Sequence, residues 1–288
     1  MSSKRTRITI LVDNDSLDAA SVPDPAPAGL ASEHGLGFWI ESDGRRILFD
    51  TGQGPSLRAN VPAIGIDLAQ TDVLALSHGH YDHTGGADYV LGLATHAQVY
   101  CHPAVVQTRY SLRDGKARSI GIPAHPRKAL KRLPAERLRW VLGPIILTER
   151  VRLTGPIPRT TGYEDTGGPF YLDKAGWRPD PLEDDLALWV QTGEGLVVCF
   201  GCAHSGVVNT LRYIRELTQS AKIRAAIGGF HLLSASDERL EGTAEALLEL
   251  DIPLIVPCHC TGKEATRNLA EVLGRRVSPG AAGMVLEF

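Results

Sequence analysis

The feature that most constrains the fold is a cluster of potential metal ligands that follows a short apolar segment. Residues 73–76 read Val-Leu-Ala-Leu, and His78, His80, Asp82 and His83 come within the next seven positions. A short apolar run bounded by polar residues is typical of a buried strand, and loops at strand ends carry many active-site groups. Alternate loop residues can face the same way, so His78 and His80 can face one ion and Asp82 and His83 another. The sequence therefore predicts a strand that ends in a metal site.

The ligand types narrow the choice of metal. Imidazole and carboxylate groups suit zinc, manganese or iron, and catalytic sites of this kind keep one coordination position open for water. Three histidines and an aspartate at this spacing favour a metal site over a histidine-rich surface loop. We expect one or two divalent ions, with zinc as the first choice.

Three more histidines follow predicted strands. His204 comes after the apolar run 196–200, and His259 comes after the run 254–256. Because both lie where a strand would deliver a side chain to the same rim, we expect both to be metal ligands. His231 follows a strand and two glycines at the same rim, and it is a candidate metal ligand, a group that holds a ligand in place, or a catalytic and substrate-binding group.

The pattern of apolar residues predicts a mixed α/β fold for one domain that covers residues 1–288. Strands are expected at 7–12, 37–41, 46–49, 73–76, 98–101, 186–190, 196–200, 225–227 and 253–256, with a hairpin around 42–44 and helices at 207–219 and 236–250. Residues 21–29 hold three prolines and are expected to form a surface loop. Residues 103–185 lack clear periodicity, so we expect a lid-like insertion over the site without a core of its own.

Charge and composition exclude several classes of partner. Lysine and arginine number 30 against 33 acidic residues, a net charge of −3 that offers no broad field for nucleic acid. No apolar run is long enough to span a membrane, and the first residues lack the features of a signal peptide. Five cysteines form an odd set, which fits a reducing compartment. We expect a soluble cytoplasmic protein, and nothing in the sequence specifies an oligomeric state.

The histidine cluster also supports a family resemblance. Residues 77–86 resemble the His-x-His-x-Asp-His signature of the metallo-β-lactamase superfamily, and residues 50–52, Asp-Thr-Gly, resemble the turn that precedes it. Further segments resemble the subgroup of metal-dependent hydrolases related to dihydropterin ribofuranosylaminobenzene-phosphate synthase: 12–14, 33–35, Asn60, 201–206 with Asn209, 228–232 and 258–262. The resemblance implies a four-layer αββα sandwich with the site at one edge between the two sheets.

The sequence departs from the superfamily pattern after the strand at 196–200. Many members carry Gly-Asp there, and the aspartate bridges two metals, whereas this chain has Gly201-Cys202. Three alternatives follow: Cys202 ligates as a thiolate, Asp184 or Asp185 approaches from a neighbouring strand, or the site holds one ion. Cys199 with Cys202, and the similar pair Cys258 and Cys260, also raise the alternative of a zinc knot or redox pair. This alternative is less favoured, because Cys199 falls inside a predicted strand.

Four residues are candidates for contact with substrate. His34 and His102 lie near predicted strand ends, and Arg159 and Tyr163 lie in an irregular polar segment. An arginine on a loop can clamp a phosphate or carboxylate. The basic run 127–139 is either a solvated helix face or a second place to bind an anion.

These observations lead to one favoured function and two alternatives. The first is a hydrolase that cleaves an ester or phosphoester of a small anionic metabolite through a metal-bound hydroxide. Asp82 would ligate metal and receive the proton of the nucleophile, and His102 or His231 would assist the leaving group. The alternatives are a transferase like the synthase of the subgroup, and a metal-containing ligand-binding or regulatory protein with little turnover.

Overall fold

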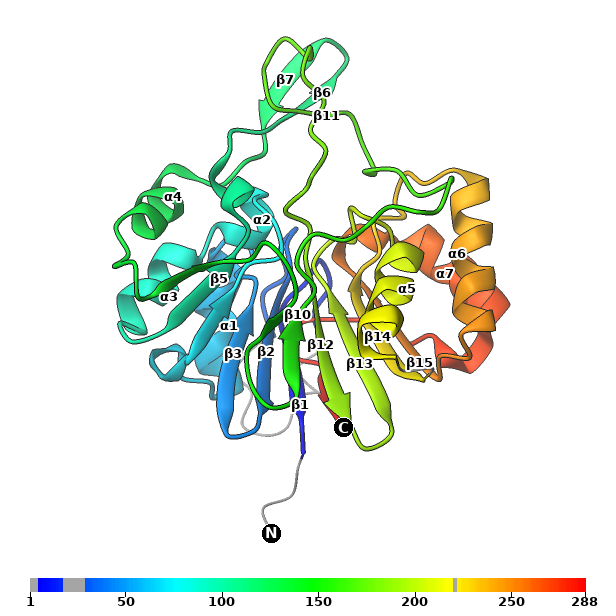
Figure 1. Ribbon diagram of the computed structural model, residues 1–288, viewed down its shortest axis with the longest axis horizontal. Helices are drawn as coiled ribbons and strands as arrows, with labels where there is room; N and C mark the ends of the chain where they lie inside the picture. Colours follow the sequence, from blue (N-terminus) through cyan, green and yellow to red (C-terminus); the bar gives the residue numbers. More distant parts are fainter. Residues whose placement is uncertain (1–4, 18–28, 220–221) are drawn as a thin grey trace.

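A computed structural model describes residues 5–17, 29–219 and 222–288. Two β-sheets pack face to face, and helices cover the outer face of each, so the chain forms the expected αββα sandwich (Figure 1). The predicted loop at 21–29 lies outside the described residues except for Gly29. No helix in the described ranges is long and apolar enough to cross a membrane.

The first sheet has seven strands, and its spatial order brings both ends of the chain together. The order is β16 (Val285–Glu287), β1 (Arg7–Val12), β2 (Gly37–Ser42), β3 (Arg45–Phe49), β4 (Val73–Ala75), β5 (Gln98–Cys101) and β8 (Leu138–Trp140). The pairs from β16 to β3 are antiparallel, and those from β3 to β8 are parallel. The antiparallel start and the hairpin around residues 42–44 are therefore confirmed.

The second sheet has six strands. Their order is β15 (Leu254–Cys258), β14 (Ile223–Gly229), β13 (Gly195–Phe200), β12 (Ala187–Thr192), β10 (Val151–Leu153) and β9 (Ile145–Ile146). Strands β13, β14 and β15 run parallel, so the residues that follow them emerge at the same edge of the sheet. That edge is where the histidines after the strands were expected.

Helices complete the outer layers. The first sheet is covered by α1 (Pro55–Ile64), α3 (Ala87–Leu93) and α4 (Ala124–Lys131), and the second by α5 (Val207–Thr218), α6 (Asp237–Glu249) and α7 (Lys263–Leu273). The predicted helices at 207–219 and 236–250 are confirmed, whereas α1, α3 and α7 were not predicted. The basic run 127–139, for which a helix face was one alternative, begins within α4. A single turn of helix, α2 (Tyr81–Thr84), lies at the site.

Alternate residues of each strand fill the two sides of the sheets. In β2, Phe38 and Ile40 point into the core between the sheets, while Trp39 packs under the outer helices. In β13, Val197 and Cys199 face the other sheet, and Val198 faces α5. Because both faces are covered, these strands read as nearly continuous apolar runs.

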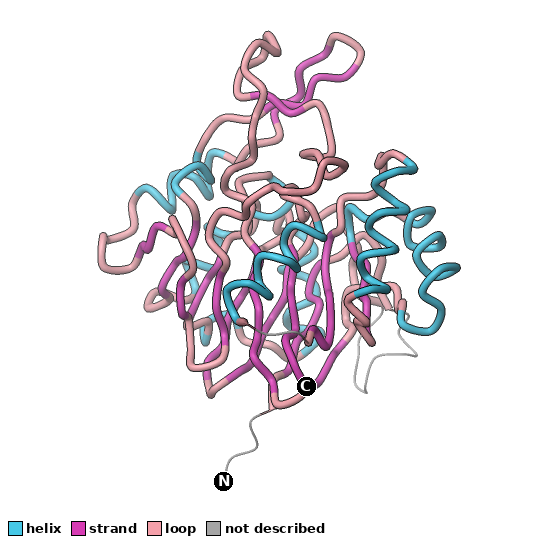
Figure 2. Tube along the Cα trace, turned by 45° about the vertical axis from the view of Figure 1, so that its right-hand side comes forward, coloured by secondary structure: helices cyan, strands magenta, loops and turns pink. Residues whose placement is uncertain are grey.

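The segment 103–185 departs from the expected lid. Helix α4 and strand β8 return to the first sheet, and β9 and β10 extend the second, where Val151 and Leu153 enter the core between the sheets. The strands are too short to produce a visible period, which explains the error. Only a small sheet of β11 (Phe170–Tyr171), β6 (Tyr110–Arg113) and β7 (Lys116–Ser119) stands above the edge of the sandwich (Figures 1 and 2).

Candidate metal centre

A buried aspartate organises the base of the site. Asp50 follows β3 with a φ of 63°, and its side chain is wholly buried. Its Oδ1 accepts the Ser77 N–H at 2.7 Å, and its Oδ2 accepts the Ser77 hydroxyl at 2.6 Å. The same Oδ2 lies 2.8 Å from His83 Nδ1, so His83 donates from Nδ1 and turns Nε2 toward the site. Asp50 was not among the predicted site residues, although the Asp-Thr-Gly turn marked its position.

The contact with Asp50 changes the protonation of His83. Burial by itself lowers the pKa of this imidazole, but the charge and hydrogen bond of Asp50 outweigh burial and raise that pKa to about 9. In the absence of metal, His83 and Asp50 are therefore a buried ion pair.

A first group of imidazoles converges from two elements. His78 Nδ1 lies 2.9 Å from the Ser77 hydroxyl, which already donates to Asp50, so His78 donates and leaves Nε2 as an acceptor. His78 Nε2 lies 3.0 Å from His80 Nδ1. His204 donates from Nδ1 to the carbonyl of Thr166 at 2.8 Å. The ring centroid of His204 lies 4.7 Å from that of His78 and 4.9 Å from that of His80.

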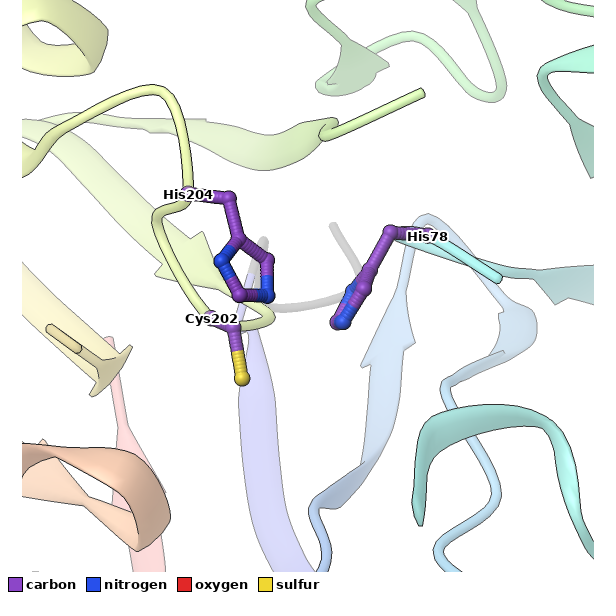
Figure 3. Close-up of side chains that lie close together, drawn as sticks. All are labelled: His78, Cys202 and His204. Carbon is purple, nitrogen blue, oxygen red and sulfur yellow. The ribbon is translucent and has the colours of Figure 1, made fainter. Parts of the chain in front are cut away.

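These three imidazoles are suited to bind a cation. Burial, reinforced by the neighbouring basic groups, lowers the pKa of His78, His80 and His204 well below the usual value. The rings are thus neutral, which is the form that ligates metal. Figure 3 shows His78 facing His204 and Cys202, which lie on one loop after β13.

A second group lies beside the first. His259 Nδ1 donates to Asn14 Oδ1 at 2.8 Å, and its Nε2 lies 3.4 Å from Asp82 Oδ2. His34 Nε2 lies 3.0 Å from the same Asp82 oxygen. Burial raises the pKa of Asp82, but the hydrogen bonds of His259 and His34 outweigh it and hold that pKa well below the usual value. Asp82 is therefore a carboxylate.

Cys202 connects the groups. Its Sγ converges within 4.8 Å with donor atoms of His78 and His204, with those of His83 and His259, and with those of His231 and Cys260. His34, Asp82 and His259 form a further group of the same size. Burial raises the pKa of the Cys202 thiol well above its usual value, so a bound cation is needed to make it a thiolate.

The glycine before Cys202 allows this approach. A Cβ on Gly201 would lie 2.1 Å from Ser77 Oγ and 3.1 Å from Asp50 Oδ2. Only a residue without a side chain lets the loop after β13 pass so close to the Asp50 network.

His231 lies at the entrance to the groups. Its ring centroid is 4.3 Å from that of His204, and its Nε2 donates to the carbonyl of Gly167 at 3.1 Å. A Cβ on Gly167 would lie 1.8 Å from the His231 ring, so this glycine fixes where the ring can lie.

The donor set fits a divalent ion. His80 Nε2, His204 Nε2 and His231 Nδ1 are buried and make no hydrogen bond to any described residue. Buried nitrogens without partners are costly unless another ligand satisfies them. A cation at this place would satisfy several at once.

A cavity of about 390 Å³ opens onto these residues. One wall carries His34, His80, Asp82, Cys202, His231, His259 and Cys260. The opposite wall comes from the small upper sheet and carries Ser111, Arg113, Lys116, Arg118 and Phe170. The three cations of β6 and β7 were not predicted to be near the site.

Three of the four residues that were predicted to contact substrate do not line this cavity. His102 is buried after β5, where its Nδ1 accepts the Ala104 N–H at 3.2 Å. Arg159 is exposed and donates to the carbonyl of Pro181, and the Tyr163 hydroxyl donates to the carbonyl of Gly242 in α6. The expected contact of Arg159 and Tyr163 with substrate is corrected, because their segment runs along α5 and α6 and not over the cavity.

The two aspartates before β12 have other partners. Asp184 binds Arg109 through both oxygens at 2.6 and 2.7 Å, and it accepts the Gly79 N–H at 2.8 Å. Asp185 Oδ2 accepts the Ser205 N–H at 2.7 Å, and burial raises the pKa of Asp185 to about 6. Each supports a loop that carries histidines, and neither belongs to a converging group of metal ligands.

The other cysteines have no part in the centre except Cys260. All five are free and buried, and Cys199 lies in the core between the sheets. A pair of Cys199 and Cys202 is therefore wrong, because Cys199 faces the core between the sheets, whereas Cys202 Sγ converges with the histidines of the centre.

The fold and the site define an αββα sandwich with a histidine-rich centre at one edge of its sheets, and the donor groups of this centre fit a divalent ion. Residues 34–259 match the sequence profile of the Metallo-beta-lactamase superfamily. The chain belongs to that superfamily.

Relatives agree with this assignment. The chain is 31% identical over 271 residues to 7,8-dihydropterin-6-methyl-4-(beta-D-ribofuranosyl)-aminobenzene-5'-phosphate synthase of Methanocaldococcus jannaschii, covering 89% of this chain and 90% of that protein. It is also 31% identical to Tm1679, described as a metal-dependent hydrolase of the beta-lactamase superfamily, with a TM-score of 0.81 over 98% of this chain and 99% of the other. The fold of YhfI from Bacillus subtilis is similar at 13% identity, with a TM-score of 0.55 over 99% and 100% of the two chains.

Proposed function

We propose that this protein is a metal-dependent hydrolase that cleaves an ester or phosphoester of a small anionic metabolite. The observation that carries the proposal is the cavity, which has metal-ligand groups on one wall and Arg113, Lys116 and Arg118 on the other. Cations that face a reactive centre across a small cavity favour a substrate with a phosphate or carboxylate.

The ligand groups fit one or two divalent ions. His78, His80 and His204 would hold an ion on one side, and Asp82, His83 and His259 would hold an ion on the other. When bound, such an ion supplies a Lewis acid and lowers the pKa of a coordinated water from 15.7 toward about 7. The remaining steps fall to side chains of this chain.

Asp82 and His231 are the candidates for proton transfer. Asp82 Oδ2 lies between His34 Nε2 and His259 Nε2, at 3.0 and 3.4 Å, and can hold the proton of an attacking water. His231 donates to Gly167 from Nε2, so Nδ1 is free to take up the proton that the attacking water releases and to pass it to a leaving oxygen. His102 has no role in this proposal, since it does not line the cavity.

The upper wall would orient the substrate. Arg118 Nη2 lies 3.5 Å from the Tyr81 hydroxyl, and its guanidinium stacks over the Tyr81 ring at 5.6 Å. An arginine held in this way can bind a phosphate or carboxylate bidentately. Phe170 packs against His80 and His204 with ring centroids 5.3 and 5.6 Å apart, and it offers an apolar face for the rest of the substrate.

A screen of metal-loaded protein against phosphomonoesters, phosphodiesters, lactones and carboxylic esters tests the proposal. For an anionic substrate, replacing Arg113, Lys116 and Arg118 by alanine should raise KM by at least about tenfold, because each lost charge pair is worth on the order of 1 kcal/mol. The matched control replaces Arg127, Lys128 and Lys131, which lie on α4 and outside the cavity lining. Equal effects of the two triple variants would contradict the role of the upper wall.

A second candidate is a transferase, and the identity to the synthase of M. jannaschii favours it. Phe170 and Tyr81 could stack with an aromatic ring, and the cations could bind the phosphate of a ribofuranosylaminobenzene phosphate. This phosphate is incubated with a reduced pterin that carries a leaving group on its methyl carbon, and the products are identified by mass analysis. A coupled product with release of the leaving group supports the transferase, and cleavage of simple esters alone supports the hydrolase. Tight binding without turnover would leave a ligand-binding protein.

A further inference from the structure

We propose that Cys202 is the ligand shared by two metal ions, in the place where related proteins carry a bridging carboxylate. The proposal rests on the metal centre of the proposed function, and it is independent of the substrate. It assigns a shared sulfur ligand to two groups whose histidines and aspartate supply nitrogen and oxygen.

The position of Cys202 Sγ between two groups of histidines supports a shared role. Donor atoms of His78 and His204 converge with Cys202 Sγ within 4.8 Å, and so do donor atoms of His83 and His259. These pairs belong to two different groups, and Cys202 is common to both. Its Sγ lies 3.1 Å from His83 Nε2, close to the separation of about 3.5 Å expected for a nitrogen and a sulfur on one tetrahedral zinc.

The charge of two neighbouring divalent ions also supports a shared thiolate. Two divalent ions at about 3.5–4 Å repel each other, and an anion between them offsets this repulsion. The first group, His78, His80 and His204, contains no acidic side chain, and Asp82 lies on the far side between His34 and His259. A Cys202 thiolate would supply the missing negative charge between the groups.

The carboxylates of Asp50, Asp184 and Asp185 do not lie between the two ligand groups as Cys202 does. Asp50 binds Ser77 and His83 from behind the site, and Asp184 is paired with Arg109. Asp185 accepts the Ser205 N–H through Oδ2, while its Oδ1 is buried and makes no hydrogen bond to the described residues. None of these three belongs to a converging ligand group among the described residues, so they do not replace the bridging aspartate.

A shared thiolate has a consequence for metal choice. Soft sulfur ligands select zinc, cobalt or iron, and they disfavour magnesium, calcium and manganese, which prefer oxygen. The centre should therefore bind zinc in preference to manganese when both are offered.

Cobalt substitution gives a direct test. Chelator-treated full-length protein is titrated with Co²⁺, and the near-ultraviolet charge-transfer band from thiolate to cobalt is followed. A shared thiolate predicts a band that grows over two equivalents of Co²⁺. A band that saturates at one equivalent means that Cys202 binds one ion only and overturns the shared role.

Variants identify the sulfur. Cys202→Ala should abolish the band and weaken binding of at least one ion by about tenfold or more, whereas Cys202→Asp should restore two ions without the band and raise the relative affinity for manganese. Cys101→Ala and Cys199→Ala are matched controls, because both residues are free and buried away from the centre. Circular dichroism establishes that each variant is folded.

The outcomes separate the two proposals. Cobalt binding without a thiolate band in the wild type overturns the inference and leaves the metal centre intact. A band that persists in Cys202→Ala and disappears in Cys260→Ala assigns the sulfur to Cys260 and also overturns it. Failure to bind any divalent ion overturns both the inference and the proposed function.

Discussion

Replacing Asp50 by asparagine should remove the main support of the histidine cluster, and its effect should depend on pH. The Asp50 carboxylate accepts hydrogen bonds from the Ser77 amide, the Ser77 hydroxyl and His83, all within the buried base of the site. Asparagine keeps the shape, but it has no charge and turns an N–H toward one of these donors.

The magnitude follows from the pKa of His83. In the metal-free protein this pKa is raised from 6.5 to about 9, chiefly by Asp50 against the opposing effect of burial. A group whose pKa is raised by folding stabilises the fold fully below its unfolded pKa, and this stabilisation disappears as the pH rises through the folded pKa. The shift corresponds to about 3 kcal/mol, present below pH 6.5 and lost by about pH 9.

The assay is chemical denaturation of chelator-treated protein at pH 6 and pH 9.5. The wild type should be more stable than Asp50→Asn by about 3–5 kcal/mol at pH 6, the cost of breaking a buried ion pair. This difference should shrink by about 3 kcal/mol at pH 9.5, where His83 is neutral in both proteins. Asp72→Asn is the control, because Asp72 binds the Arg45 side chain and the Arg46 amide and has no histidine partner. A difference between wild type and Asp50→Asn that is the same at both pH values would refute this reasoning.

Three further changes test other parts of the structure. Gly201→Ala should destabilise the protein by about 1–3 kcal/mol in thermal unfolding and lower metal affinity, because the new Cβ would overlap Ser77; wild-type stability would contradict the close approach. Gly167→Ala should lower kcat while metal content stays at the wild-type level, since the Cβ displaces the His231 ring; loss of metal instead would make His231 a ligand. Arg109→Met should cost about 3–5 kcal/mol in denaturant unfolding, because it leaves Asp184 and Asp180 buried without their cation; a cost below about 1 kcal/mol would contradict this.

The sequence predicted the site best where histidines directly follow apolar strands. The histidine cluster follows a strand, and His204 and His259 also follow strands, so the parallel order of β13, β14 and β15 is enough to bring them to one edge. The two longest helices were found for a similar reason, since their apolar residues repeat with the period of a helix.

Other elements carried weaker signals. Helix α1 begins at Pro55 after Gly54 and contains Pro62, so it looks like a loop in the sequence. Helix α7 could have been predicted, because Ala265, Leu269 and Leu273 repeat every four residues, and the structure buries all three.

The upper wall of the cavity could not be found from local sequence. Arg113, Lys116 and Arg118 are exposed residues of a short hairpin, and nothing near them in the chain indicates a site. Their place opposite the metal ligands depends on how the hairpin pairs with β11, some 50 residues later in the chain. Arg159 and Tyr163 were chosen for their residue types, and packing against α5 and α6 takes them elsewhere.

The most direct test of the central claim is the metal content of purified protein, measured by elemental analysis for the wild type, His80→Ala, His204→Ala and the control His125→Ala. His125 is an exposed residue of α4 and should leave the metal content unchanged. We expect bound divalent metal in the wild type and the control, and loss of at least one ion per chain in both His80→Ala and His204→Ala. A wild-type protein without metal under metal-replete conditions would contradict the account.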